Sequence, residues 1–390
     1  MTPQARVQSA IEVLDLVIAA ARNKGAPADR ILSDWFRTRR YAGSKDRRAV
    51  RELVFAAIRA CGEIPASGRA AMLRLAAGDP ALSTLFDGSR HGPGPIVPDE
   101  PMAGAGPAPA WLAEALERSG VDAEGQAALL RRAPVDIRIN TLKQALAILP
   151  EPGEPTLAPH GRRFAPDTAV ESWPAYQAGA IEVQDAGSQL VCEAVAVRPG
   201  EAVVDLCAGA GGKTLALAAA MDDRGRLLAC DADRARLARL MPRAERAGVS
   251  IVETRLLDGG REAAGLADWA GRADAVLVDA PCSGTGTWRR NPESRWRLTP
   301  AEVARLAALQ HRLLGIAAGL VRPGGRLVYV VCSLLDAEGG GQIDAFLREN
   351  AGWRAVPPAL GAGQVRGVGL RLTAQFDVCD GFFVARLERL

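Results

Sequence analysis

Two cysteines follow apolar runs and stand in short segments rich in Pro, Ser and Gly. Cys282 lies in DAPCSGTG (279–286), and Cys332 lies in YVVCS (329–333). A cysteine thiolate is a strong nucleophile when nearby groups lower its pKa, so this pattern is typical of covalent catalysis. Most cysteines in soluble proteins are instead small buried apolar residues. We expect burial for the other five, which are Cys61, Cys192, Cys207, Cys230 and Cys379.

A glycine-rich segment, DLCAGAGGKT (205–214), follows another apolar run and leads into a helical pattern. Glycines let a backbone approach a ligand closely, and a helix N-terminus offers free N–H groups. Asp231 ends the next apolar run, where a carboxylate can accept hydrogen bonds from ribose hydroxyls.

Two kinds of nucleotide site fit this segment poorly. A dinucleotide fingerprint requires Gly or Ala where Thr214 stands, and a phosphate loop requires a longer spacing before its Gly-Lys pair. S-adenosylmethionine has a ribose and no phosphate, and it is the nucleotide-like ligand that remains. The alternative is a tight strand-to-helix turn that binds nothing.

An α/β sheet would position these residues. After residue 180, helical stretches alternate with β-branched runs, and we expect strands at 202–207, 226–230, 250–254, 274–279 and 326–331. This alternation predicts a parallel sheet covered by helices. Strands 274–279 and 326–331 would be neighbours in a doubly wound sheet, so their carboxyl ends could bring Cys282 and Cys332 into one pocket.

The first part of the chain has a different pattern. Val7, Ile11, Leu14 and Ile18 recur at helical spacing, and strand signals are absent from the first 80 residues. We expect four parts: a helical domain (1–88), a Pro/Gly-rich linker (89–109), a small α/β subdomain (110–180) and a catalytic domain (181–390).

Composition excludes several classes of protein. Of the 390 residues, 48% are hydrophobic and 24% are charged, which indicates a globular chain. No apolar run is long enough to span a membrane, and residues 1–25 lack the apolar core of a signal peptide, so we expect a cytoplasmic protein. The seven cysteines form no C-x-x-C pair and the three histidines lie far apart, so we expect neither a disulfide framework nor a metal site.

Taken together, the motifs resemble the signature of the RsmB/Sun family of RNA cytosine-5 methyltransferases. The similarity covers CAGAGGKT (207–214), the two cysteine segments, RINTLK (138–143) and DGFF (380–383). The resemblance implies a Rossmann-like class I methyltransferase domain, which is an α/β fold with a doubly wound, mostly parallel sheet. It also implies an N-terminal all-helical, NusB-like domain that binds RNA, and a small α/β linker subdomain.

The same resemblance implies an enzyme that transfers a methyl group from S-adenosylmethionine to carbon 5 of cytosine. A covalent cysteine adduct at carbon 6 of the base would activate carbon 5. We expect a monomer that acts on small-subunit ribosomal RNA. Transfer RNA or another substrate, and a non-catalytic RNA-binding relative, stay open as alternatives.

Site residues follow from matching positions in the family's motifs. Cys332 would be the nucleophile, Cys282 would help to release the product, and Asp279 would lie beside cofactor and base. Asp231 would hold the ribose and Asp258 the adenine. The methionine part would be held by the turn Cys207, Ala208, Gly209, Ala210, Gly211, Gly212 and Lys213, with Lys213 pointing toward the active site.

The chain departs from the family at two positions. The family usually has proline where Ala210 stands and threonine where Val331 stands. Neither change removes a group that the chemistry requires, so we expect activity to survive.

Two basic segments are candidates for RNA contact. WRRNPESRWR (288–297) combines Arg289 and Arg290 with tryptophans, which suits phosphate contact and base stacking. Residues 1–60 hold twelve Arg or Lys against six Asp or Glu, and Arg39, Arg40 and Lys45 lie in their most basic part. An ordinary solvated charged surface is the alternative for both segments.

Overall fold

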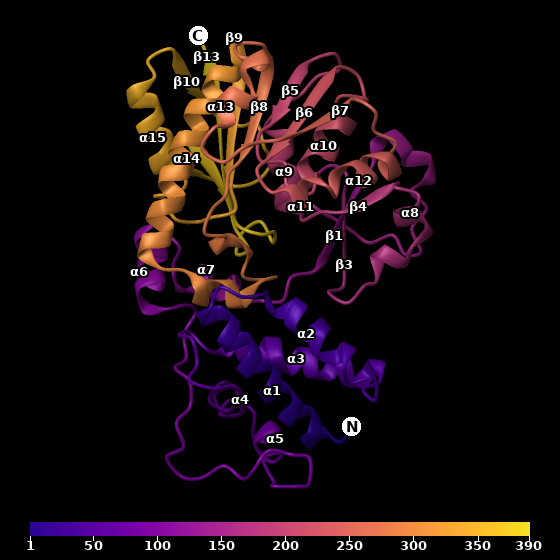
Figure 1. Ribbon diagram of the computed structural model, residues 1–390, viewed down its shortest axis with the longest axis vertical. Coiled ribbons are helices and arrows are strands. Elements are labelled where there is room, and N and C mark those ends of the chain that lie inside the picture. Colours follow the sequence, from indigo (N-terminus) through magenta and orange to yellow (C-terminus); the bar gives the residue numbers. More distant parts are fainter. The chain divides into compact units, whose positions relative to one another are not determined.

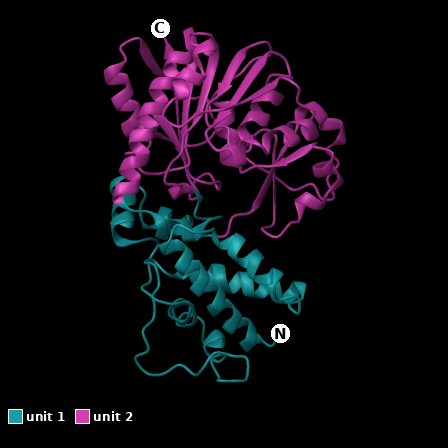
Figure 2. Ribbon diagram, in the orientation of Figure 1, with its two compact units in different colours: residues 1–131, 287–299 teal, residues 132–286, 300–390 magenta.

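The computed structural model describes residues 1–390, which form two compact units (Figure 2). The first unit contains residues 1–131 and 287–299. The second contains residues 132–286 and 300–390. The chain therefore returns to the first unit for one short segment before it completes the second.

The first unit is helical. Its core buries an apolar face of the first helix, including Val7, Leu14 and Ile18, as the helical spacing predicts. Thr2 caps that helix, since its hydroxyl oxygen accepts a hydrogen bond from the N–H of Ala5. The helices are α1 (Pro3–Arg22), α2 (Ala28–Arg37), α3 (Ser44–Ala60), α4 (Gly68–Ala76), α5 (Pro80–Ser83), α6 (Ala110–Arg118), α7 (Ala123–Ala128) and the 3-10 helix η5 (Pro292–Arg297).

The segment 287–299 supplies part of the core of the helical unit. Arg295 has no exposed surface, and its guanidinium donates to the carbonyls of Ile58 and Cys61, each at 2.7 Å. Burial lowers the pKa of Arg295 to about 10. Trp296 packs among the apolar residues of the unit and donates from its indole nitrogen to the carbonyl of Gly62 at 3.2 Å.

The segment 288–297, a candidate for RNA contact by its composition, buries most of its large side chains. Trp288, Arg295 and Trp296 are buried, and Arg289 is only 5% exposed. Arg295 is held by backbone acceptors and Trp296 by an apolar core, so neither is offered to a base or a phosphate.

The Pro/Gly-rich segment 89–109 contains no helix or strand, yet it packs onto the helical unit. Arg69 pairs with Glu100 and donates to the carbonyls of Gly94 and Pro95, each at 3.0 Å. The N–H of Ala103 donates to the carbonyl of Ala70 at 3.0 Å. The compact units thus divide the chain after residue 131, whereas composition alone placed boundaries at 88 and 109.

The second unit contains a small antiparallel sheet with the strand order β2-β3-β1-β4. Ile137, Phe164 and Ile181 form its apolar core. Its elements are β1 (Val135–Ile139), β2 (Glu154–Pro155), β3 (Gly161–Phe164), β4 (Ile181–Val183), α8 (Pro174–Gln177) and the 3-10 helices η1 (Thr141–Leu146) and η2 (Val170–Ser172).

The main sheet of the second unit has nine strands (Figure 1). The order along it is β11-β12-β13-β9-β8-β5-β6-β7, and β10 pairs with β13. Neighbours from β9 to β7 are parallel, and the remaining pairs are antiparallel. The strands are β5 (Ala202–Asp205), β6 (Arg226–Asp231), β7 (Val252–Leu256), β8 (Ala273–Asp279), β9 (Val321–Val331), β10 (Trp353–Val356), β11 (Gln364–Arg366), β12 (Gly369–Leu372) and β13 (Phe382–Arg389).

The five strands expected in this region are confirmed, with small shifts at their ends. The largest shift is in β9, which begins at Val321 rather than at 326. Its pairing with β8 changes register between Ala273 and Ala275, because residues 322–325 are inserted there.

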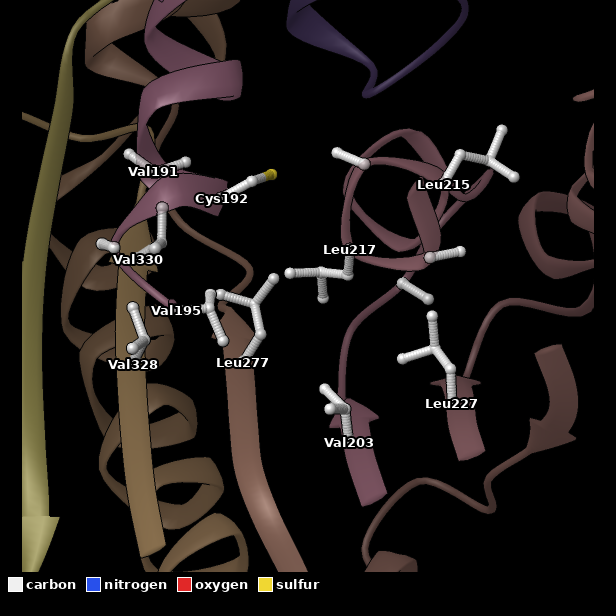
Figure 3. Packing of buried hydrophobic residues seen from close by; sticks show 14 of the residues in the cluster. Val191, Cys192, Val195, Val203, Leu215, Leu217, Leu227, Leu277, Val328 and Val330 are labelled. Carbon is white, nitrogen blue, oxygen red and sulfur yellow. The ribbon is translucent and has the colours of Figure 1, made fainter. Parts of the chain in front are cut away.

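Helices cover both faces of the sheet, as alternating side chains require. Val203, Leu277 and Val328 face a core that includes α9 and α10 (Figure 3). Their chain neighbours, including Val204 and Val278, face the opposite core with α14 and α15. The helices and 3-10 helices are α9 (Ala186–Glu193), α10 (Gly212–Ala220), α11 (Arg234–Leu237), α12 (Leu240–Ala247), α13 (Glu262–Gly265), α14 (Pro300–Leu320), α15 (Gly340–Glu349), η3 (Ala267–Trp269) and η4 (Thr285–Thr287). None of the helices is both long and apolar enough to cross a bilayer.

The buried arginine of the helical unit gives a stability test. Arg295→Met keeps a long side chain but removes the guanidinium that donates to the carbonyls of Ile58 and Cys61; the carbonyl of Ile58 keeps the N–H of Cys61 at 3.3 Å, whereas that of Cys61 loses its donor. Unpaired buried acceptors cost about 1–3 kcal/mol, so the free energy of unfolding in a urea titration should fall by that amount. Arg305→Met removes an exposed arginine of α14 and should change that free energy by less than about 0.5 kcal/mol. Equal losses in the two variants would contradict the structural role of Arg295.

Candidate active site

Parallel pairing of β8 with β9 brings the two cysteine segments together. Asp279, at the end of β8, lies opposite Val330 near the end of β9, so both strands end at the same edge. The sulfur atoms of Cys282 and Cys332 are 3.3 Å apart, and both residues are partly exposed. The prediction that these two strands are neighbours and that their cysteines converge is confirmed.

The surroundings of Cys282 favour its protonated form. The hydrogen bond to Cys332 raises the pKa of the Cys282 thiol well above its ordinary value, and burial and the charges of Cys332 and Glu338 add to the rise. Cys282 therefore keeps its proton and can donate it in the hydrogen bond. The structure therefore places a protonated thiol directly beside the sulfur of Cys332.

An ion pair connects the glycine-rich turn to the end of β8. The Nζ of Lys213, in the first turn of α10, lies 2.7 Å from a carboxylate oxygen of Asp279. Burial by itself lowers the pKa of Lys213, but the charge of Asp279, its hydrogen bond and the nearby Cys192 and Cys332 together outweigh burial, and the net shift is upward. Lys213 is therefore a cation at neutral pH, and it pairs with the carboxylate at the end of β8.

The turn after β5 requires glycine at two positions. Gly209 and Gly211 have φ angles of 57° and 88°, in the left-handed region that other residues rarely adopt. Asp231, at the end of β6, accepts a hydrogen bond from the N–H of Gly209 at 2.7 Å. The carbonyl of Ala210 accepts one from Arg243 at 2.6 Å. These contacts fix the turn although alanine stands where the family usually has proline.

Asp205, at the end of β5, stabilises the start of α10. It is completely buried, and it accepts a hydrogen bond from the hydroxyl of Thr214 at 2.7 Å. Its other carboxylate oxygen has no hydrogen-bond partner. Burial raises the pKa of Asp205 to about 7.

The edge formed by β5, β6 and β7 fits an adenosine-like ligand. A Cβ added to Gly212 would meet no atom within 4 Å, so the N-terminus of α10 borders open space. Asp231 ends β6, and the exposed Asp258 follows two residues after β7. A close-approach turn, a helix N-terminus and two carboxylates at one sheet edge suit a ligand with a ribose and a base.

Comparison with known proteins identifies the family. Residues 192–388 match the family described as 16S rRNA methyltransferase RsmB/F. The chain belongs to this family. A relative from Synechocystis sp., named Probable ribosomal RNA small subunit methyltransferase B, is 36% identical over 298 residues, which are 72% of this chain. They are 66% of the relative, so the chain spans just under two thirds of its length.

Solved structures agree with this assignment. The crystal structure of PH0851 covers 100% of this chain and 99% of its own, with 25% identity and a TM-score of 0.77. That of a methyltransferase homolog protein from Pyrococcus horikoshii covers 72% of this chain and 99% of its own, with 26% identity and a TM-score of 0.60. The fold is therefore the Rossmann-like class I methyltransferase fold with an N-terminal helical region, as the sequence predicts.

The second departure from the RsmB/F pattern, Val331, lies in the apolar core. It has no exposed surface and ends β9 directly before Cys332. An apolar side chain satisfies this position without a hydroxyl. Cys61, Cys192, Cys230 and Cys379 are buried as predicted, whereas Cys207, in the glycine-rich turn, is partly exposed.

The basic residues predicted in the helical unit differ in their surroundings. Arg39 lies over the ring of Trp35, with 3.9 Å between guanidinium carbon and ring centroid, and pairs with Glu12 at 3.6 Å. Arg40 and Lys45 lie on either side of the turn between α2 and α3. Arg290 is half-buried in the segment 287–299.

Sequence reasoning missed a buried polar cluster next to the cysteines. Ser283 and Ser333, which directly follow Cys282 and Cys332, both donate to the carboxylate of Glu338. All three polar residues are buried. The repeated Cys-Ser pair was the signal in the sequence, but nothing in the spacing indicated which acceptor the serines share.

The raised pKa of Asp205 predicts a pH-dependent stability. The folded protein binds this proton more tightly than the unfolded chain, whose pKa is near 3.8. The stabilisation is therefore complete below pH 3.8 and is lost as the pH rises toward 7, with a slope of at most about 1.4 kcal/mol for each pH unit.

Two variants measure this dependence. Asp205→Asn keeps the acceptor for Thr214 and should flatten the fall in melting temperature between about pH 5 and pH 7, because it removes the titrating group. Asp222→Asn, at an exposed site, should keep the wild-type slope. A wild-type slope in Asp205→Asn would contradict the assignment.

Proposed function

We propose that this chain is an S-adenosylmethionine-dependent RNA (cytosine-5)-methyltransferase that acts on small-subunit ribosomal RNA. The observation that carries the proposal is the contact between the sulfurs of Cys282 and Cys332. Asp279, in the same segment as Cys282, forms an ion pair with Lys213. A methyltransferase that acts on an already nucleophilic atom has no need of two such cysteines. The family description and the name of the Synechocystis relative support ribosomal RNA as the substrate.

The cysteine pair suits the activation of a poorly nucleophilic carbon. Carbon 5 of cytosine gains electron density when the sulfur of Cys332 bonds to carbon 6, a covalent step typical of nucleophilic catalysis. Attack at carbon 6 requires a proton at nitrogen 3, and Asp279 in its protonated form would donate it and orient the ring. S-adenosylmethionine, when bound, supplies an electrophilic methyl group to carbon 5.

Product release reverses the first step. A base removes the proton from carbon 5, and the electron pair of that bond expels the sulfur of Cys332 from carbon 6. Cys282 is already hydrogen-bonded to this sulfur and retains its proton, so it is placed to assist the departure. The two cysteines thus divide attack and release between them.

Cofactor binding is assigned to the turn and the neighbouring strand ends. The turn from Cys207 to Lys213 would hold the methionine part, Asp231 the ribose and Asp258 the adenine. Asp231 already fixes the turn through Gly209, so a single carboxylate would link turn geometry to ribose recognition.

RNA contact is assigned to the basic turn between α2 and α3. Arg40, Lys45 and Arg48 lie there and form no ion pair, and Tyr41 is 71% exposed. Cations without a fixed partner and an accessible ring suit phosphate contact and base stacking. Arg39 would contribute less because Trp35 and Glu12 already hold it. Cytoplasmic location and a monomeric state stay predictions.

The division of labour between the sulfurs is tested with two variants. Cys332→Ala should abolish methylation of a small-subunit ribosomal RNA transcript and leave S-adenosylmethionine affinity, measured by calorimetry, within about twofold. Cys282→Ala should instead trap a protein–RNA adduct that survives on a denaturing gel. Cys61→Ala, in the helical unit, is the control and should behave as wild type. Methylation by Cys332→Ala would remove the proposed nucleophile, and absence of the adduct would remove the release role.

The basic turn is tested by salt dependence. Replacement of Arg40, Lys45 and Arg48 by alanine should weaken binding of the transcript and reduce the slope of log affinity against log salt by about one for each lost phosphate contact. Arg224 and Arg354, exposed in the second unit, provide a matched control when both are replaced by alanine. An unchanged salt slope in the triple variant would show that this surface does not contact RNA.

A further inference from the structure

Glu338 is a buried carboxylate in the turn between β9 and α15, and it has no exposed surface. One of its oxygens accepts hydrogen bonds from the N–H of Ser283 at 2.9 Å and from the amide of Gln310 at 3.0 Å. The other accepts from the hydroxyl of Ser333 at 2.6 Å and, over a short distance, from the hydroxyl of Ser283. Four donors thus surround one carboxylate.

No arginine or lysine pairs with Glu338, in contrast to two other buried acids of the second unit, Glu182 and Glu262. Glu182 pairs with Arg243 and Arg246, and Glu262 pairs with Arg312. A buried charge is costly unless hydrogen bonds compensate it, and such a network holds its members in one geometry because each lost bond is expensive.

Three of the four donors of Glu338 come from the two segments that carry the cysteines. Ser283 follows Cys282 and Ser333 follows Cys332 in the chain. Gln310 extends the connection, since its amide also donates to the carbonyl of Pro281 at 2.9 Å. One carboxylate therefore binds the residue next to each sulfur.

Further hydrogen bonds join the two cysteine segments directly. The N–H of Gly286 donates to the carbonyl of Cys332 at 3.0 Å, and the N–H of Leu334 donates to the hydroxyl of Thr285 at 2.9 Å. The hydroxyls of Ser283 and Ser333 also lie 3.1 Å apart, and the carboxylate of Glu338 binds both of them.

We propose that Glu338 is a positioning residue that keeps the sulfurs of Cys282 and Cys332 within hydrogen-bonding distance by binding Ser283 and Ser333. The proposal rests on the proposed function for its catalytic meaning. Glu338 itself touches neither sulfur and is not a catalytic residue. Its negative charge also contributes to the raised pKa of Cys282, so it supports the protonated state of that thiol.

A disulfide trap measures the positioning without any RNA. Diamide oxidises two neighbouring thiols to a disulfide and is itself reduced to the hydrazine, and mass spectrometry of unreduced peptides reports the 282–332 bond. In full-length protein, Glu338→Ala should slow this closure by about tenfold or more, because the segments lose their shared acceptor. Glu338→Gln keeps the shape and one acceptor oxygen, and its closure rate should lie between those of wild type and Glu338→Ala.

Glu262→Gln is the matched control, since it neutralises a buried carboxylate that binds Arg312 and not the cysteine segments. It should close the disulfide at the wild-type rate. Ser333→Ala provides a second, milder variant that removes one link and should also slow closure, whether or not Glu338→Ala folds. Wild-type rates in Glu338→Gln and Ser333→Ala, or no closure in the wild type, would overturn the proposal.

Methylation kinetics separate this proposal from the proposed function. On the ribosomal RNA transcript, Glu338→Gln should lower kcat by about tenfold to a hundredfold with an unchanged KM for S-adenosylmethionine. An inactive wild type whose disulfide closure still depends on Glu338 would refute the proposed function and leave the positioning role intact. If the wild type is active but replacing Glu338 changes neither the rate of disulfide closure nor kcat, the positioning role is refuted and the proposed function stands.

Discussion

The contact between the sulfurs of Cys282 and Cys332 depends on one constraint, the register of β8 against β9. Each residue of a strand advances the chain by about 3.3 Å, so a slip of one residue would move one sulfur by the whole length of the contact. It would also turn Val328 and Val330 away from one core and toward the other. The alternation of apolar side chains between the two faces of the sheet therefore determines where the two sulfurs lie at its edge.

Electrostatics refine what the register establishes. Lys213 neutralises Asp279 beside the cysteine segment, and the carboxylate of Glu338 is compensated by hydrogen bonds alone. Both the partner sulfur and that carboxylate raise the pKa of Cys282 and so keep its proton in place. The protonated form of Cys282 follows from these neighbours.

The parts of this structure that sequence reasoning predicted depend on local pattern. Buried strands show as β-branched runs, and Pro, Ser and Gly mark the loops that follow, so the edge with Cys282 and Cys332 could be predicted. The shared acceptor Glu338 could not, because it requires knowing which buried groups meet in space. The burial of Arg295 could not be predicted for a similar reason, since arginine beside tryptophan has the composition of a solvated or RNA-binding loop. Its real partners are backbone carbonyls at the end of α3, which no side-chain pattern shows.

The return of residues 287–299 to the helical unit has a consequence for biosynthesis. The seven helices of residues 1–131 emerge from the ribosome first. At that stage the core they form still lacks Trp296, and the carbonyls of Ile58 and Cys61 still lack the guanidinium of Arg295. Four of the nine strands of the main sheet, β5 to β8, have then to be translated before these side chains emerge. The helical unit begins folding first, yet it is completed only after more than half of the following domain has left the ribosome.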